Sequence, residues 1–323
     1  MNWARLAALA AGVAALCWIV ASVGLEAIVQ DVALAGGAIP AAIGVHAVQL
    51  WFSGLSWRMS SGAGRIGTLT FVRIRWIREG VNTLLPAAQI GGQVVGVRQL
   101  AQAGVAPALA VASTILDLAL EAVSQLFVVM LAMGVLLLLR DGDRAWVAWV
   151  TAGLGATAVG VVGMIVALRL GVLRLVETGL RRAVVRWPSG AGWSMEGLHA
   201  TLMARQADSW AMGRALALHS VSWALGAFEV WVILRALGHG VGLGPAFVIE
   251  SLAMAARSAG FVVPGAVGVQ EGGFVLVCGL FGVGPEPALA LSVLKRLREL
   301  LVGGGALAVW QWSAPPGRIS ERV

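Results

Sequence analysis

The feature that most constrains this chain is a series of long apolar runs, each about as long as a helix needs to cross a bilayer. A hydrocarbon core of about 30 Å takes about 20 helical residues, and a lipid-exposed backbone must satisfy its own hydrogen bonds. The runs are too long and too continuous for barrel strands, so we predict an all-α, polytopic helical membrane bundle with about six full spans. The expected spans are approximately Leu6–Leu25, Ile39–Trp57, Ala106–Leu139, Ala145–Leu168, Ala215–Leu237 and Ala288–Trp312.

The composition supports a membrane protein and excludes two other classes. Only 12% of the 323 residues are charged, while 59% are hydrophobic. Soluble domains carry about 25% charged residues, so an ordinary soluble enzyme and a disordered chain are both excluded. We expect a single transmembrane domain over residues 1–323. Cys17 and Cys278 lie inside apolar runs and the histidines are scattered, so we predict no metal site, no cofactor and no catalytic set.

The basic residues indicate both a partner and an orientation. The net charge of +7 comes almost entirely from arginines that flank or interrupt the apolar runs, which favours anionic lipid headgroups over nucleic acid as the partner. Arginines cluster after the second and fourth runs, so the positive-inside rule places both termini in the cytoplasm. Tryptophans near the expected ends, Trp57 among them, fit interfacial anchors. Residues 171–214 are too charged to span. They fit an amphipathic helix on the inner leaflet, or alternatively a solvated linker helix.

Two apolar segments, Val81–Leu100 and Leu252–Phe281, are interrupted by proline and glycine and recur in one register. A single offset without gaps aligns Pro86 with Pro264, and it also aligns Glu121 with Glu299. Because an odd number of expected spans separates the copies, we predict two re-entrant hairpins in an inverted repeat, with halves near 73–139 and 250–312. Compositional bias is the alternative explanation. The expected helix breaks are Pro86, Gly91, Gly92, Pro264, Gly268, Gly272 and Gly273.

Charged residues inside the apolar runs form matching stripes. Asp117 and Glu121 share a helical face, and Lys295 and Glu299 do the same in the last run. A charge at a bilayer centre costs about 3 kcal/mol on insertion scales, so we expect these groups to pair across the bundle. They would act either as structural contacts between helices or as a polar chamber for a lipid headgroup or a coupled proton. The chamber set is Asp117, Glu121, Lys295, Arg296, Arg298 and Glu299, with the two acids facing the basic residues of the last run.

The broken segments supply the candidate headgroup site. Arg257 together with Arg75 or Arg78 is suited to bidentate contact with a phosphate, and helix N-termini after a break favour anions. The alternatives are that Arg73 and Arg75 are positive-inside anchors and that the glycine pairs only permit tight helix packing. The candidate headgroup residues are Arg75, Arg78, Asn82, Gln89, Arg257, Gln270 and Glu271.

Two long motifs carry a family resemblance. The run RWIREGVNTLLPAAQIGGQVVG from Arg75 to Gly96, and the run RSAGFVVPGAVGVQEGGF from Arg257 to Phe274, resemble the membrane protein linked to hopanoid biosynthesis in bacteria. That family is part of the superfamily of the lysylphosphatidylglycerol synthase transmembrane (flippase-like) domain. The resemblance implies an inner-membrane protein that moves or handles a polar lipid. Full lysyl-lipid synthases carry a soluble acyltransferase-like domain after the membrane part. Because this chain ends at Val323, aminoacyl transfer from tRNA is not expected of it.

Three functions are compatible with these features. The first is a lipid translocase, which handles an anionic or hopanoid-related lipid. The second is an intramembrane lipid-modifying enzyme with Glu271 or Asp117 as its acid or base. The third is a membrane scaffold that docks lipid-biosynthesis enzymes through Arg181, Arg182 and Arg186 on its inner face.

Overall fold

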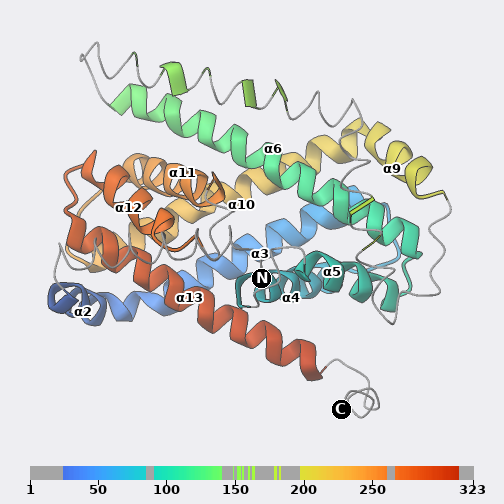
Figure 1. Ribbon diagram of the computed structural model, residues 1–323, viewed down its shortest axis with the longest axis horizontal. Coiled ribbons are helices and arrows are strands. Elements are labelled where there is room, and N and C mark those ends of the chain that lie inside the picture. Colours follow the sequence, from blue (N-terminus) through green and yellow to red (C-terminus); the bar gives the residue numbers. More distant parts are fainter. Residues whose placement is uncertain are drawn as a thin grey trace.

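The computed structural model describes residues 25–84, 91–139, 197–259 and 266–312, with a few isolated residues between 148 and 182. Within these ranges every regular element is helical, which confirms the predicted all-α class (Figure 1). The elements are α2 (Leu25–Ala35), the short 3₁₀ helix η1 (Gly36–Ala38), α3 (Ile39–Ser61), α4 (Thr68–Leu84), α5 (Gly91–Gln102), α6 (Pro107–Leu139), α9 (Leu198–Ala207), α10 (Ser209–Ala236), α11 (Leu243–Ala259), α12 (Val269–Gly279) and α13 (Pro285–Trp312).

Four of the six expected spans fall on described helices, namely α3, α6, α10 and α13. Three stretches of the described chain are both long and apolar enough to cross a membrane: Ile28–Ser61, Pro107–Leu139 and Ser209–Ala236. The first and fourth expected spans lie wholly or largely outside the described residues, as does most of the 171–214 segment. The protein is therefore a helical membrane protein.

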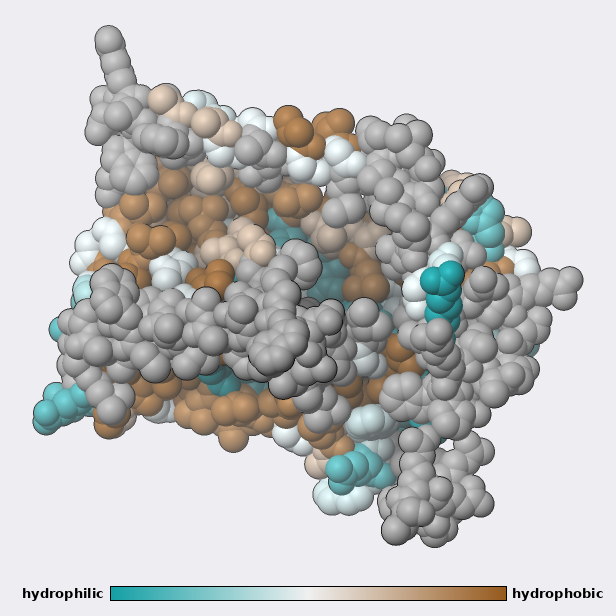
Figure 2. Space-filling model, viewed as in Figure 1, coloured by the Kyte–Doolittle hydropathy of each residue, from teal (hydrophilic) through white to brown (hydrophobic). Residues whose placement is uncertain are grey.

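The last helix, α13, buries charged side chains and exposes apolar ones, as membrane helices do. Its Lys295 and Arg298 side chains are buried, with 1% and 5% exposure, whereas Leu300 on the same helix is 57% exposed. Figure 2 shows apolar residues over much of the visible surface of the described chain. In water this arrangement would be unfavourable, but in a bilayer it buries charge among protein partners and presents leucine to lipid.

The long helices α3 and α10 pack against each other more extensively than any other pair of described elements, and they run antiparallel. Ser53 Oγ lies 2.9 Å from Ser222 Oγ, and Ser56 Oγ donates to the Ala215 carbonyl at 2.8 Å. Residue numbers therefore rise along α3 as they fall along α10. Small hydroxyl side chains allow this close approach and also hydrogen-bond across it, as is common between membrane helices.

A succession of three helices occurs twice, as α4–α5–α6 (unit one) and as α11–α12–α13 (unit two). The offset that aligns Pro86 with Pro264 also aligns the first residue of α5 with that of α12, and the first residue of α6 with that of α13. The packing is reciprocal as well, because α6 lies on α11 and α13 lies on α4. Gln125 Nε2 donates to the Met254 carbonyl at 3.3 Å, and Trp76 Nε1 donates to the Val302 carbonyl at 2.8 Å. Met254 and Trp76 are themselves related by this offset.

The predicted helix breaks separate α4 from α5 and α11 from α12. Pro86 and Pro264 lie outside the described residues, and Gly91 is the first residue of α5. A Cβ at Gly92 would lie 2.2 Å from the Arg78 carbonyl oxygen, so only glycine lets α5 start this close to α4.

The second break has its own glycines. Gly268 adopts φ +80° directly before α12, a conformation that favours glycine. Gly273 packs tightly, since a Cβ there would lie 3.2 Å from Ala256 Cβ, whereas Gly272 has open space around it. Tight packing therefore explains one glycine of each pair, Gly92 and Gly273.

The antiparallel contact of α3 and α10 can be tested by crosslinking. With the two native cysteines replaced, Ser53→Cys combined with Ser222→Cys should form a disulfide under mild oxidation, because the two hydroxyl oxygens are in contact. Mass spectrometry of the proteolysed protein would identify the linked peptides. The matched control is Ser53→Cys with Val221→Cys, since Val221 is exposed on the same helix. Equal crosslinking of both pairs, or of neither, would contradict the packing.

Candidate functional site

Two clusters of buried charged side chains lie between the helices, and the first, cluster 1, joins α4, α6 and α10. It consists of Arg75, Arg78, Asp117, Glu121 and His219. Arg78 Nη1 donates to Asp117 Oδ2 at 2.6 Å, and its Nη2 donates to Glu121 Oε2 at 3.1 Å. Arg75 donates to both carboxylate oxygens of Glu121, with one contact at 2.8 Å. His219 Nε2 lies 2.9 Å from Asp117 Oδ1. The two arginines thus balance the two carboxylates in a bidentate network.

Helical spacing explains why these groups meet. Arg75 and Arg78 are three residues apart on α4, while Asp117 and Glu121 are four apart on α6, so each pair shares one helix face. Trp57 of α3 closes the cluster, because the Arg78 guanidinium lies 4.9 Å from its ring centroid. The sequence predicted Trp57 to be an interfacial anchor. That prediction is wrong, since Trp57 is fully buried between the helices.

Cluster 2 joins α3, α4, α10, α11 and α13. It consists of His46, Glu79, Glu229, Glu250, Lys295 and Arg298. Lys295 Nζ donates to Glu229 at 3.0 Å and to Glu250 at 2.9 and 3.1 Å. Arg298 Nε donates to Glu229 Oε1 at 3.0 Å. Lys295, Arg298, Glu229 and Glu250 form the core of cluster 2. As in cluster 1, two cations face two carboxylates, so this core is formally neutral.

The outer part of cluster 2 connects the two three-helix units. Arg298 of α13 donates through Nη1 to His46 Nδ1 of α3 at 3.0 Å, and His46 Nε2 lies 2.9 Å from Glu79 Oε1 of α4. Because a guanidinium has no lone pair to offer, His46 accepts at Nδ1. A chain of polar contacts therefore runs from α13 through α3 to α4.

Two further ion pairs lie beside cluster 2. Arg257 of α11 pairs with both carboxylate oxygens of Glu299 on α13. Arg296 Nε donates to Glu271 Oε1 at 2.6 Å. The other oxygen of Glu271 accepts from the Gly268 backbone N–H at 2.8 Å, so this glutamate also holds the N-terminus of α12.

The expected pairing of Asp117 and Glu121 with the basic residues of α13 is wrong. Those two acids pair with Arg75 and Arg78 of α4, and Lys295 pairs with glutamates of α10 and α11. Helix packing does not select these partners, because α6 packs extensively against neither α13 nor α4. The long Arg75 and Arg78 side chains of α4 reach the two carboxylates across the intervening space.

The candidate headgroup residues are distributed over several places rather than gathered in one open site. Arg75 and Arg78 belong to cluster 1, while Arg257 pairs with Glu299. Asn82 Oδ1 accepts from the Gly92 N–H at 2.9 Å at the start of α5, and Gln270 Nε2 donates to Ser292 Oγ at 3.3 Å. Gln89 lies outside the described residues.

The sequence reasoning left several members of the clusters out of its site. They are His46, Glu79, His219, Glu229 and Glu250. A signal was available for Glu229, since it is the only carboxylate within the expected span Ala215–Leu237 and an ionisable residue there indicates function or a buried partner. The two histidines gave no such signal, because the histidines are scattered along the sequence without metal-ligand spacing.

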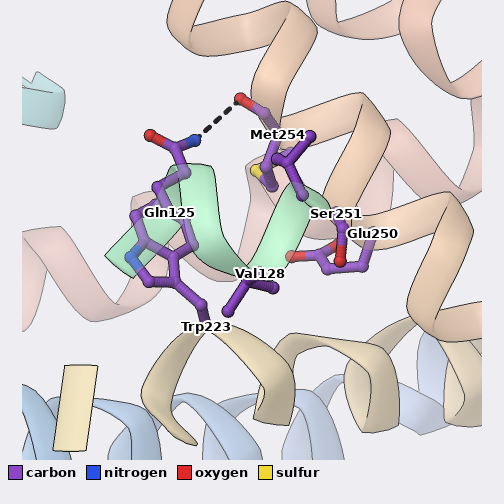
Figure 3. A pocket seen from close by; sticks show the side chains of 7 residues that line it. Gln125, Val128, Trp223, Glu250, Ser251 and Met254 are labelled. Atoms are coloured by element: carbon purple, nitrogen blue, oxygen red, sulfur yellow. Dashed lines mark hydrogen bonds between the residues drawn. The ribbon is translucent and has the colours of Figure 1, made fainter. Parts of the chain in front are cut away.

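Two small cavities adjoin the clusters. One lies between α6, α10 and α11 and is lined by Gln125, Trp223, Glu250 and Ser251, among others (Figure 3). The other lies between α4 and α13 beside Glu79, Arg298 and Glu299. Each has a volume of about 10 Å³, roughly the space for one water molecule. In this conformation the arginines are therefore occupied by carboxylates and no lipid headgroup fits either cavity.

The charged side chains of the described residues suit anion binding more than metal binding. No group of three or more histidine, cysteine or acidic side chains in the described chain is placed to hold a metal ion. What the arrangement offers is paired guanidinium forks, which suit phosphate as well as carboxylate, and acids whose counterions lie on other helices.

Comparison with known proteins gives one match. A family model described as "Lysylphosphatidylglycerol synthase TM region" matches residues 5–304. A comparison with curated proteins and another with solved structures gave no match.

Removal of one partner from cluster 1 should destabilise the fold strongly. Breaking a buried ion pair by deleting one partner costs about 3–5 kcal/mol, because the remaining charge is left uncompensated. We expect Arg78→Gln to lower the Tm of the purified protein in detergent, measured by fluorescence-detected thermal unfolding. Addition of Asp117→Asn should recover much of the loss, since the orphaned charge is then removed.

The matched control is Arg73→Gln, because Arg73 is an exposed arginine on the same helix as Arg78. Its Tm should stay close to that of the wild type. Equal destabilisation by Arg73→Gln and Arg78→Gln would argue against cluster 1.

Proposed function

Since the chain belongs to the family of the lysylphosphatidylglycerol synthase TM region, we propose that it is a lipid translocase that moves a polar lipid between the leaflets. The proposal places the protein in the bacterial inner membrane with both termini in the cytoplasm. Its substrate would be an anionic or hopanoid-related lipid, and soluble lipid-biosynthesis enzymes would supply or use that lipid. Family membership supports a role in membrane lipid biology, and the buried charges support transport as that role.

The observation that carries the proposal is the internal correspondence of the charged clusters. Glu121 and Glu299 are equivalent under the repeat offset, and each pairs with an arginine on the first helix of its own unit. Asp117 and Lys295 are equivalent as well, and each pairs with a residue of opposite charge on that first helix, Arg78 or Glu250. Equivalent positions on α6 and α13 therefore hold ion pairs in both units, although their partners on α4 and α11 do not stand at equivalent positions.

The antiparallel contact of α3 and α10 supports an inverted repeat. These helices precede the two three-helix units, and their ends also differ by nearly the same offset, since α3 ends at Ser61 and α10 at Ala236. Helices that are equivalent, antiparallel and long enough to span are related by an axis in the membrane plane. Inverted repeats of this kind carry the substrate site at their interface in many transporters.

The proposed mechanism is an exchange of partners by the arginines. A lipid phosphate approaching the interface of the two units would replace a carboxylate on the Arg257 guanidinium, the candidate headgroup arginine that is most exposed, at 27% of its side chain. The released Glu299 would turn toward the neighbouring Arg298 or take up a proton. Arg75 and Arg78 would repeat this exchange with Asp117 and Glu121 on the opposite side of the membrane. The arginines that hold the helices together through ion pairs would thus also bind the headgroup as it crosses the membrane.

The alternative roles have less support. Glu271 as an acid or base would need a free oxygen, but one oxygen binds Arg296 and the other accepts the Gly268 N–H. Asp117 is fully buried with His219 and two arginines around it, so a substrate has no approach in this conformation. Of the three arginines of the scaffold hypothesis, only Arg182 is described, and it is exposed.

Reconstitution tests the proposal directly. Purified protein in liposomes with a fluorescent phospholipid should move label to the outer leaflet, measured as the fraction bleached by an impermeant reductant over time. Arg257→Lys should lower this rate by about tenfold, because an ammonium cannot hold a phosphate in two places, although the charge beside Glu299 is kept.

The matched control is Arg214→Lys, since Arg214 is exposed near the start of α10 and belongs to neither cluster. It should keep the wild-type rate. A wild-type rate equal to that of protein-free vesicles across anionic, zwitterionic and hopanoid lipids would overturn transport. A lipid of changed mass in the same vesicles would instead identify an enzyme.

A further inference from the structure

The structure contains a buried carboxylate, Glu250 on α11, that the transport mechanism above does not use. Its oxygens lie 2.9 and 3.1 Å from Lys295 Nζ on one side, and its side chain lines the cavity between α6, α10 and α11 on the other. Figure 3 shows Glu250 at this cavity together with Gln125 and Trp223. We propose that Glu250 is a proton-binding site, reached by water through this cavity, whose protonation permits lipid movement. The proton-binding site stands independently of the proposed function, whereas the control of lipid movement by protonation rests on it.

The charges around Glu250 favour proton binding there over the other acids of the clusters. Glu250 shares its cation with a second carboxylate, because Lys295 Nζ also donates to Glu229 at 3.0 Å. Glu229 has Arg298 as an additional partner, whereas Lys295 is the only cation in direct contact with Glu250 among the described residues. Two carboxylates facing one ammonium repel each other, and neutralising the less supported one relieves that repulsion.

The cavity side of Glu250 is built for a single water. Ser251 Oγ is buried, lines the same cavity and has no hydrogen-bond partner among the described residues. A cavity of about 10 Å³ holds about one water, which would accept from Ser251 and donate to the carboxylate. The groups that α6 and α10 present at this cavity are uncharged, Gln125 and Trp223 among them. No charged side chain of α6 or α10 therefore competes with Glu250 for a proton at this cavity.

A glycine on the neighbouring helix makes room for the carboxylate. A Cβ at Gly226 of α10 would lie 2.6 Å from Glu250 Oε1 and 2.8 Å from its Cγ, both too close for a real side chain. The position of the carboxylate between Lys295 and the cavity thus depends on this glycine. Leucine or alanine would be better helix formers here, so the close approach is the physical reason for glycine.

Protonation would act on the interface between the two units. A proton from the solvent, relayed by the cavity water, which receives one proton and passes one on, joins a carboxylate oxygen of Glu250 and gives the neutral acid. Lys295 keeps its protons and stays bound to Glu229. One of the two ion pairs between α11 and α13, Glu250–Lys295, is then lost, while Arg257–Glu299 remains. The helix α11 also packs against α6 of unit one. Once α11 is held less tightly by α13, it can move away from α6, and the contact between the two units can open toward the proposed headgroup path.

The first test requires no transport. Infrared difference spectra of the purified protein in membranes, recorded between about pH 8 and pH 5, should show the C=O stretch of one protonated buried carboxylic acid. The band should disappear in Glu250→Gln and persist in the matched control Glu286→Gln, whose glutamate is exposed at the start of α13. A band that persists in Glu250→Gln, or no band in the wild type, overturns the proton site.

The second test measures coupling in the reconstituted liposomes. The wild-type rate of lipid movement should rise by about tenfold between pH 8 and pH 5, in step with the protonated fraction. In Glu250→Gln, where the amide imitates the neutral acid, the rates at the two pH values should be equal. Ser251→Ala, which removes only an unpaired hydroxyl and should fold normally, should reduce the pH response as well.

The outcomes separate the two proposals. Lipid movement by the wild type that is independent of pH, or an unchanged pH response in both variants, overturns coupling and leaves transport standing. No lipid movement at any pH, with the infrared band present and lost in Glu250→Gln, overturns transport and leaves the proton site standing. If Glu250→Gln does not fold, Ser251→Ala decides: an unchanged infrared band and pH response in that variant overturn the inference.

Discussion

The cost of a charge in a low-dielectric interior governs this fold. An uncompensated ion buried away from water is strongly unfavourable, so each buried charge must sit against a counterion with correct hydrogen-bond geometry. Arg78 meets Asp117 at 2.6 Å and Lys295 meets Glu250 at 2.9 Å. These contacts constrain which face of α4 is turned toward α6 and which face of α11 is turned toward α13. Leucine and valine cannot fix the rotation of a helix in this way. Lipid is as apolar as they are, so turning them from protein toward lipid costs little free energy.

The same pairs that specify the packing make rearrangement possible. A hydrophobic contact between two helices is lost gradually as they separate, whereas a guanidinium can exchange one oxyanion for another while keeping its hydrogen bonds. Clusters 1 and 2 each contain a core of two cations and two carboxylates, so partners can be exchanged inside a cluster without changing its net charge. A transporter needs this property, because its helices must have two arrangements of similar free energy.

The two units differ in one respect that bears on how they would work. At equivalent positions, unit one has Asp117 where unit two has Lys295, and each finds an opposite charge on its own first helix. The backbone arrangement is thus repeated while the sign of the charge is reversed. Unit one contributes the paired arginines Arg75 and Arg78, whereas unit two contributes Arg257 beside Glu299 and Glu250 beside Lys295. In the proposed mechanism both units supply headgroup arginines, and the proposed proton site lies in unit two.

The sequence by itself determined the class of protein, the position of the four expected long helices that the structure describes, and the register of the repeated segment. Apolar length and low charge force helices in a bilayer, and the offset read from Pro86 and Glu121 reappears in the starts of α5 and α12. It also determined which side chains are too polar to face lipid. Only the tertiary structure decided which of them meet. The sequence placed Asp117 opposite α13, and it missed Glu229, Glu250 and His219, because helical periodicity reports the face on which a residue lies but not the helix that covers that face.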